Sequence, residues 1–125
     1  MTVKSPICPE RIRKIPGQFS WLDQRLVSEH YIDRCTHGAA ALYLFLVTVA
    51  DARGLSFYAD QTLCRRLAMD ECALVRYRQQ LIDLGLIAYR RPLCQVLAIA
   101  ADAPRQGGSL QSLEQVFKRI GEGLK

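Results

Sequence analysis

Arginine and glutamine side chains recur in the second half of the chain, and both can form paired hydrogen bonds with planar polar groups. Two Arg pairs stand on either side of a segment that contains Arg76, Gln79 and Gln80. An Arg side chain can donate two hydrogen bonds to a guanine edge, and a Gln amide can pair with an adenine edge. Taken singly, such side chains are common on any solvated helix and are more often structural or inert than functional. The two pairs are Arg65-Arg66 and Arg90-Arg91.

The other reactive side chains form no catalytic or metal-binding pattern. His30 and His37 are the two histidines, and no nucleophile, base or phosphate-loop motif stands at a recognisable spacing. The five cysteines contain no CxxC pair and have no His at a zinc spacing, so we interpret them as reduced thiols in apolar surroundings. We expect a non-catalytic, cytoplasmic protein without cofactor or metal. The cysteines are Cys8, Cys35, Cys64, Cys72 and Cys94.

Length and composition favour one folded domain. The chain has 125 residues, of which 50% are hydrophobic and 23% charged, and this is ordinary globular composition. The net charge is +5, and 13 of the 17 basic residues are Arg, which mildly favours a polyanionic partner. No segment is a basic tail, so a positive surface must arise from folding. The apolar run 39–50 is too short to span a bilayer, and we expect neither a secretory signal nor a membrane segment.

The N-terminal third is expected to be the least regular part. Residues 1–16 contain three prolines among basic residues, which predicts a partly extended basic arm. Residues 18–35 are aromatic-rich without a clean period, and we predict a short strand near 19–22 followed by an irregular or short helical segment. A helix over 37–52 then begins after the N-cap Thr36, with Gly54 as its stop. This helix is apolar all round, so every side of it must be covered.

The middle of the chain predicts helices and a hairpin. Residues 55–58 could form a short strand, 60–67 a short helix, and 71–84 a longer helix between an Asp70 cap and a Gly85 stop. Apolar stretches on either side of Arg90-Arg91-Pro92 predict a two-stranded hairpin with a basic turn. The expected order is helix, strand, helix, turn, helix, hairpin.

The C-terminal part predicts a linker, 101–108, and an amphipathic helix over 109–125 with Ser109 as its cap. Its apolar residues recur at helical spacing, but two heptads do not define a coiled coil. Two alternatives therefore stay open: the helix docks on its own domain, or it forms a homodimer. The apolar helix 37–52 is another candidate for the homodimer contact. The apolar residues of the C-terminal segment are Leu110, Leu113, Phe117, Ile120 and Leu124.

Residues 59–97 resemble the winged helix-turn-helix family. The resemblance implies a mainly α fold with a small β-hairpin wing, a domain over 17–100, an N-terminal extension and a C-terminal helix. The aromatic-rich segment before the first helix is similar to that of replication initiator and replisome-organiser domains, and of accessory proteins of plasmids and transposons. The matching positions are Thr62-Leu63, Leu67-Ala68-Met69, Leu74, Tyr77, Leu81 and Gly85-Leu86-Ile87.

The resemblance also implies roles for the grouped side chains. In this family the second helix of the pair enters the major groove, while the preceding helix and the wing contact phosphates. With Leu74, Tyr77 and Leu81 pointing inward, the outward residues of helix 71–84 are expected to read base edges, and the two Arg pairs to bind phosphate. The expected base-reading residues are Ala73, Arg76, Gln79 and Gln80, and the expected phosphate contacts are Arg65, Arg66, Arg90 and Arg91.

Two features depart from the family pattern. Asp70 and Glu71 place negative charge at the start of the helix that would approach phosphates, where helix capping favours it and DNA does not. Arg78 stands where the family usually has an apolar residue. Either its stem covers the core with the charged head in solvent, or it is displaced outward as a further phosphate contact.

Two functions from different classes follow. The first is double-stranded DNA binding, in transcriptional regulation or in replication or transposition of a mobile element. The second is a winged-helix module that binds protein through helix 37–52, the segment around Trp21 or the C-terminal helix.

Overall fold

Helix α2 (His37–Val49) lies at the centre of the fold. The computed structural model describes residues 3–99, so the predicted linker 101–108 and the helix 109–125 lie outside the described residues. The Thr36 hydroxyl accepts a hydrogen bond from the Ala39 amide at 3.2 Å, which confirms the predicted N-cap. The helix is shorter than predicted, because Ala50 is already extended and ends it before Gly54.

A small antiparallel sheet packs beside this helix. Its strands are β1 (Leu55–Ser56), β2 (Ile87–Arg90) and β3 (Leu93–Val96), in the order β1-β3-β2. The predicted hairpin is confirmed, with Ile87 opposite Val96 and Arg90 opposite Leu93. The predicted strand 55–58 ends at Ser56, since only these two residues pair with β3.

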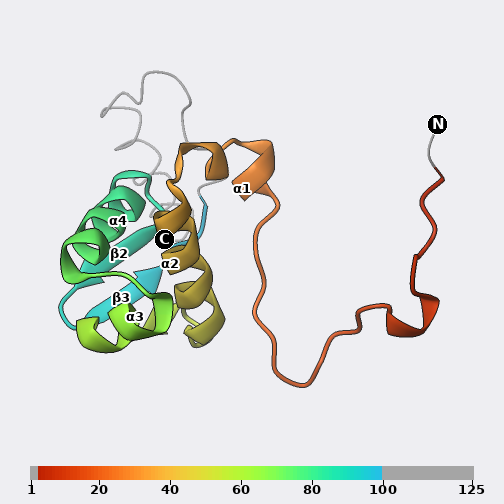
Figure 1. Cartoon of the computed structure of the whole chain (residues 1–125), viewed down its shortest axis with the longest axis horizontal. Coiled ribbons are helices and arrows are strands. Elements are labelled where there is room, and N and C mark those ends of the chain that lie inside the picture. The colour runs from red at the N-terminus through yellow and green to blue at the C-terminus, as the bar shows by residue number, and fades with distance from the viewer. Residues whose placement is uncertain (1–2, 100–125) are drawn as a thin grey trace, which may run out of the picture.

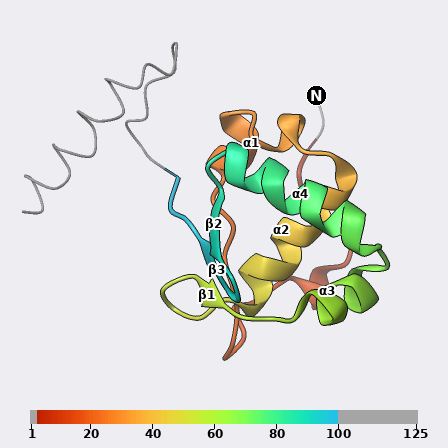
Figure 2. The same cartoon turned by 90° about the vertical axis from the view of Figure 1, so that its left-hand side faces the viewer.

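Helices α3 (Asp60–Leu67) and α4 (Glu71–Asp83) follow β1 and begin and end where the sequence predicts, to within a residue. Asp70 caps α4 by accepting a hydrogen bond from the Ala73 amide at 2.7 Å. Gly85 follows α4 with a φ of +78°, a backbone conformation that glycine adopts without strain. Figure 2 shows α3 and α4 against α2, with the strands to one side.

The segment before α2 has no strand. Residues 19–22 are exposed and unpaired with any strand among residues 3–99, so the predicted strand is wrong. The reason is tertiary, because this segment runs beside α2, where the Ser20 hydroxyl donates to the Thr48 carbonyl at 3.1 Å. The predicted helical segment is confirmed as α1 (Arg25–Ser28) with the 3-10 turn η2 (Ile32–Arg34).

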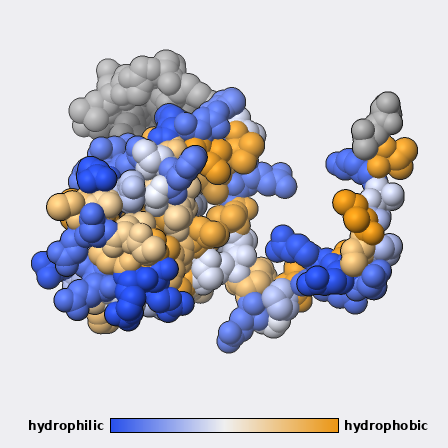
Figure 3. All heavy atoms as spheres, viewed as in Figure 1, coloured by the Kyte–Doolittle hydropathy of each residue, from blue (hydrophilic) through white to orange (hydrophobic). Residues whose placement is uncertain are grey.

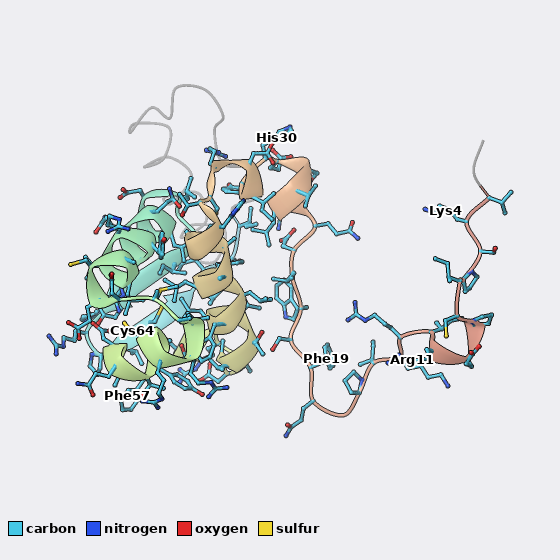
Figure 4. All side chains as sticks on the ribbon, viewed as in Figure 1. Lys4, Arg11, Phe19, His30, Phe57 and Cys64 are labelled. Carbon is cyan, nitrogen blue, oxygen red and sulfur yellow. The ribbon has the colours of Figure 1, made fainter. Side chains whose placement is uncertain are left out.

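Residues 3–18 form an extended arm with one 3-10 turn, η1 (Pro9–Arg11), and every one of them is exposed. The arm leaves the domain on the side of α2 opposite to α3 and α4 (Figure 1). Figure 4 shows Lys4 and Arg11 on the arm, away from the domain, and Phe19 where the arm approaches α2. The predicted extended basic arm is confirmed for the described part.

The core lies between α2, α4 and the hairpin. Its fully buried large side chains come from all three, and each contributes roughly 1.5–3 kcal/mol by leaving water. The described residues thus form an α-rich domain of four α-helices with a three-stranded antiparallel sheet. In residues 3–99, no helix has both the length and the apolar character needed to cross a membrane. The fully buried side chains are Leu42, Leu74, Leu81, Leu86 and Ile87.

Candidate nucleic-acid interface

The outward face of α4 carries Arg76 and Gln79, as the sequence predicts. Both side chains are exposed. The Arg76 guanidinium lies 5.7 Å from the centre of the Tyr77 ring, and the Gln79 amide donates to Asp83 at 2.9 Å. Contacts at an exposed surface such as these are weak enough to be exchanged for contacts with a ligand. Arg76 and Gln79 are therefore available to a partner that approaches α4 from outside.

Ala73 and Gln80 do not belong to this outward face. Ala73 is 9% exposed, because it lies one turn before Tyr77 in the same buried stripe as Leu74. The prediction that it faces out is wrong. The Gln80 side-chain oxygen accepts hydrogen bonds from the amide and the hydroxyl of Thr36, at 2.8 and 3.0 Å. Gln80 thus holds the start of α2 and is not free to read a base.

Two further residues lie on the outward face of α4 and were not predicted from the sequence to be part of the site. Cys72 and Val75 are exposed, and with Arg76 and Gln79 they follow the spacing of one helical face. That spacing was the signal that could have identified them. Val75 beside Arg76 offers an apolar contact of the kind that a thymine methyl group takes.

Arg65 and Arg66 stand in the last turn of α3, and both are exposed. The Arg66 guanidinium lies 5.6 Å from the centre of the Phe45 ring of α2, so Arg66 points toward α2. Figure 3 shows strongly hydrophilic residues gathered over α3. Of this predicted pair, Arg65 lies free of a ring or carboxylate in residues 3–99, whereas Arg66 is held over an aromatic face.

Arg90 and Arg91 lie at the tip of the β2–β3 hairpin, where Arg90 pairs with Leu93 across the turn, and both are exposed. The Arg91–Pro92 peptide bond is cis. Pro92 shares a small cavity with Tyr58 and Arg78, so the tip lies close to the start of α3. The structure therefore places these two Arg residues beside the α3–α4 pair.

Arg78 joins α3, α4 and the hairpin. Its side chain is 12% exposed, and its guanidinium donates to the Asp60 carboxylate at 2.6 Å. The same group lies 4.1 Å from the centre of the Tyr89 ring on β2. Both predicted alternatives for Arg78 are wrong, because its guanidinium is neither free in solvent nor displaced outward but paired with Asp60 in a partly buried ion pair. Arg78 thus fixes where the hairpin stands relative to α3 and α4.

Charge on this side of the molecule is mixed. Asp70 caps the start of α4, Glu71 is exposed in its first turn, and Asp83 lies at its end. Among residues 3–99, the exposed Arg residues of α3, α4 and the hairpin tip form no ion pair. Arg side chains therefore stand at the middle of α4, on α3 and at the hairpin tip, while carboxylates stand at the two ends of α4.

The cysteines of the described part are free thiols. Burial raises the pKa of Cys35 and of Cys94, which keeps both groups protonated at neutral pH. Cys64 lies on α3 (Figure 4), and its pKa is raised by burial and by nearby carboxylates. No group of His, Cys, Asp and Glu in residues 3–99 could hold a metal ion.

Comparisons with known proteins returned no relative: no family model, curated protein or solved structure matches the chain.

Proposed function

We propose that the protein binds double-stranded DNA as a winged helix-turn-helix protein. The element order supports this proposal: α2, β1, α3, α4 and then the β2–β3 hairpin, with sheet order β1-β3-β2. In this arrangement α4 is the recognition helix, α3 braces it and the hairpin is the wing. The process served, transcriptional regulation or replication or transposition of a mobile element, rests on the sequence resemblance alone.

The observation that carries the proposal is the set of exposed Arg side chains on these three elements. Arg76 is exposed at the middle of α4, Arg65 on the preceding helix, and Arg90 and Arg91 at the hairpin tip. A duplex against α4 would place Arg76 and Gln79 at base edges and the other three near phosphates. Arg66 lies over the Phe45 ring and would approach the DNA backbone from the side of α2.

Replacing Arg76 with Ala should reduce discrimination between preferred and random duplexes. One bidentate base contact contributes about 1–3 kcal/mol of discrimination, or roughly five- to 150-fold in relative affinity. The measurement is fluorescence anisotropy on duplexes selected from a random pool, at fixed salt. Arg53→Ala is the matched control. Arg53 lies in the turn that is hydrogen-bonded to Val96 of β3, at the end of the sheet opposite to the hairpin tip, so it is far from the proposed contact. Equal losses on selected and random duplexes would remove the base-reading role of Arg76.

Replacing both Arg90 and Arg91 with Ala should weaken binding to all duplexes alike. Each lost phosphate contact is expected to reduce the slope of log affinity against log salt by about 0.9. Affinity measured over a salt series therefore tests the wing directly. An unchanged slope would exclude the hairpin tip from the contact.

A second function is favoured by an apolar surface on the other side of α2. Trp21 is 71% exposed and Leu44 on α2 is 56% exposed. Figure 3 shows hydrophobic residues gathered over α1 and α2. Exposed apolar groups of this size are typical of protein contacts. If this surface carries the function, the protein will bind a protein partner with little dependence on salt and will not retain duplex DNA.

A further inference from the structure

An apolar groove runs between α2 and the α1–η2 segment. It encloses about 320 Å³ and is lined almost entirely by hydrophobic side chains, with the Cys35 thiol among them. This groove coincides with the side of α2 that the sequence predicts must be covered, and residues 3–99 leave it open. The hydrophobic residues that line it most prominently are Leu22, Leu26, Ile32, Tyr43, Leu44 and Leu86.

The end of the described chain is hydrogen-bonded to a residue that lines this groove, while Val96, Leu97 and Ala98 themselves line a second groove. The Leu97 amide donates to the Leu86 carbonyl at 3.0 Å, and Leu86 lines the groove. Ile99, the last described residue, is buried in the core. The C-terminal part of the chain therefore starts from a fixed point next to an open apolar surface.

The chain beyond Ile99 is long enough to reach the groove, and it carries apolar side chains like those that line the groove. Nine residues lie between Ile99 and Ser109, and the ten residue steps that connect the two can cross roughly 33 Å when extended. The segment 109–124 carries its apolar side chains at the spacing of one helical face, and such a face is buried when it lies in an apolar groove.

A second groove near the other end of α2 is the less suitable site. It also borders the end of β3, but Ser20, Asp51 and Arg53 line it together with apolar groups. Burying an apolar helix face there would also desolvate charged groups without pairing them. Among the described residues, no charged residue lines the groove between α2 and α1–η2, so docking there desolvates no charged group.

We propose that residues 109–124 dock into the groove between α2 and α1–η2 of the same chain. A tether that starts next to a residue that lines the groove gives this segment a high effective concentration, which favours it over the same segment of a second copy. Of the two alternatives that the sequence left open, the proposal adopts docking on the chain's own domain. The inference does not depend on DNA binding, because no described residue that lines the groove lies on α3, on α4 or at the hairpin tip.

Thiol labelling of Cys35 in the full-length chain tests the docking. The variant Phe117→Gln with Ile120→Gln removes two apolar side chains from the segment, and Gln115→Ala with Lys118→Ala changes its polar side as the matched control. Docking shields the Cys35 thiol, so labelling followed by peptide mass spectrometry should be on the order of tenfold faster in the first variant and unchanged in the control. Cys72, exposed on α4, serves as the internal reference, since its labelling rate should be the same in all three proteins.

Three outcomes would overturn the proposal. Equal labelling of Cys35 in the unmodified chain and the Phe117→Gln, Ile120→Gln variant would show that the segment does not occupy the groove. Protection that is lost on roughly hundredfold dilution, with a dimer by sedimentation, would identify a second copy as the occupant. Faster labelling of Cys94 together with Cys35 would mean that the variant loosens the core, since Cys94 is buried there. DNA affinity of the variant is measured in parallel, so that failure of one proposal is distinguished from failure of the other.

Discussion

Replacing Gly54 with Ala should lower the free energy of unfolding by roughly 3 kcal/mol, combining left-handed backbone strain with a steric clash. Gly54 has a φ of +87°, and a Cβ at this position would overlap the Val96 carbonyl oxygen. The Gly54 carbonyl also accepts the Val96 amide at 2.8 Å, so the clash cannot be relieved without weakening the contact between this turn and β3. Urea denaturation followed by far-UV circular dichroism measures the change.

Gly85→Ala is the matched control for Gly54→Ala. Gly85 has a similar φ of +78°, but a Cβ there would meet no atom within 4 Å. Backbone strain is then the only effect of the substitution, and we expect the free energy of unfolding to fall by about 1 kcal/mol. Equal losses for the two variants would show that the close approach to Val96 contributes nothing.

Replacing Arg78 with Ala should lower the free energy of unfolding by about 2 kcal/mol, because the Asp60 carboxylate loses its partner and Tyr89 loses a stacked cation. The ion pair is only partly buried, with the Asp60 side chain 38% exposed, so the loss should fall below that of a fully buried pair. Denaturation of Arg78→Ala, Asp60→Ala and the double variant gives the coupling energy between the two residues. A coupling energy near zero would contradict the role assigned to this pair.

Arg76→Ala is the control for Arg78→Ala. Both variants remove one Arg from α4, but Arg76 is exposed and forms no ion pair in the described part of the chain. We expect a stability change within about 0.5 kcal/mol for Arg76→Ala. If the protein binds DNA as proposed, site discrimination should follow the reverse order, because Arg78 contacts Asp60 and Tyr89 and affects the duplex only by positioning the hairpin.

Local signals predicted most of the elements. The Thr36 and Asp70 caps, the Gly85 stop and the hairpin turn each depend on residues close in sequence, and all of them are confirmed. The strand at 19–22 failed because strand formation needs a neighbour, and this segment runs beside a helix. The coarse architecture was therefore predictable, whereas the course of the N-terminal third was decided by tertiary contacts.

The residue types of the candidate interface were predictable from the sequence. Which of those side chains are free to contact a ligand was less predictable. Arg76 and Gln79 are exposed as expected, because helical periodicity decides their position. Gln80 and Arg78 have partners 44 and 18 residues away, and no local pattern indicates such contacts. Ala73 was misplaced because a small side chain fits the buried stripe or the surface equally well by composition.

Under the proposed DNA binding, the hydrogen bonds between Gln80 and Thr36 limit how the duplex preference of α4 could be redesigned. Thr36 also caps α2, so an amino acid chosen at position 80 for a new target site would loosen the start of the central helix. A library meant to retarget the protein should vary positions 72, 75, 76 and 79 and keep 73 and 80 fixed. Selections that include position 80 are expected to return Gln there whatever duplex is used as bait.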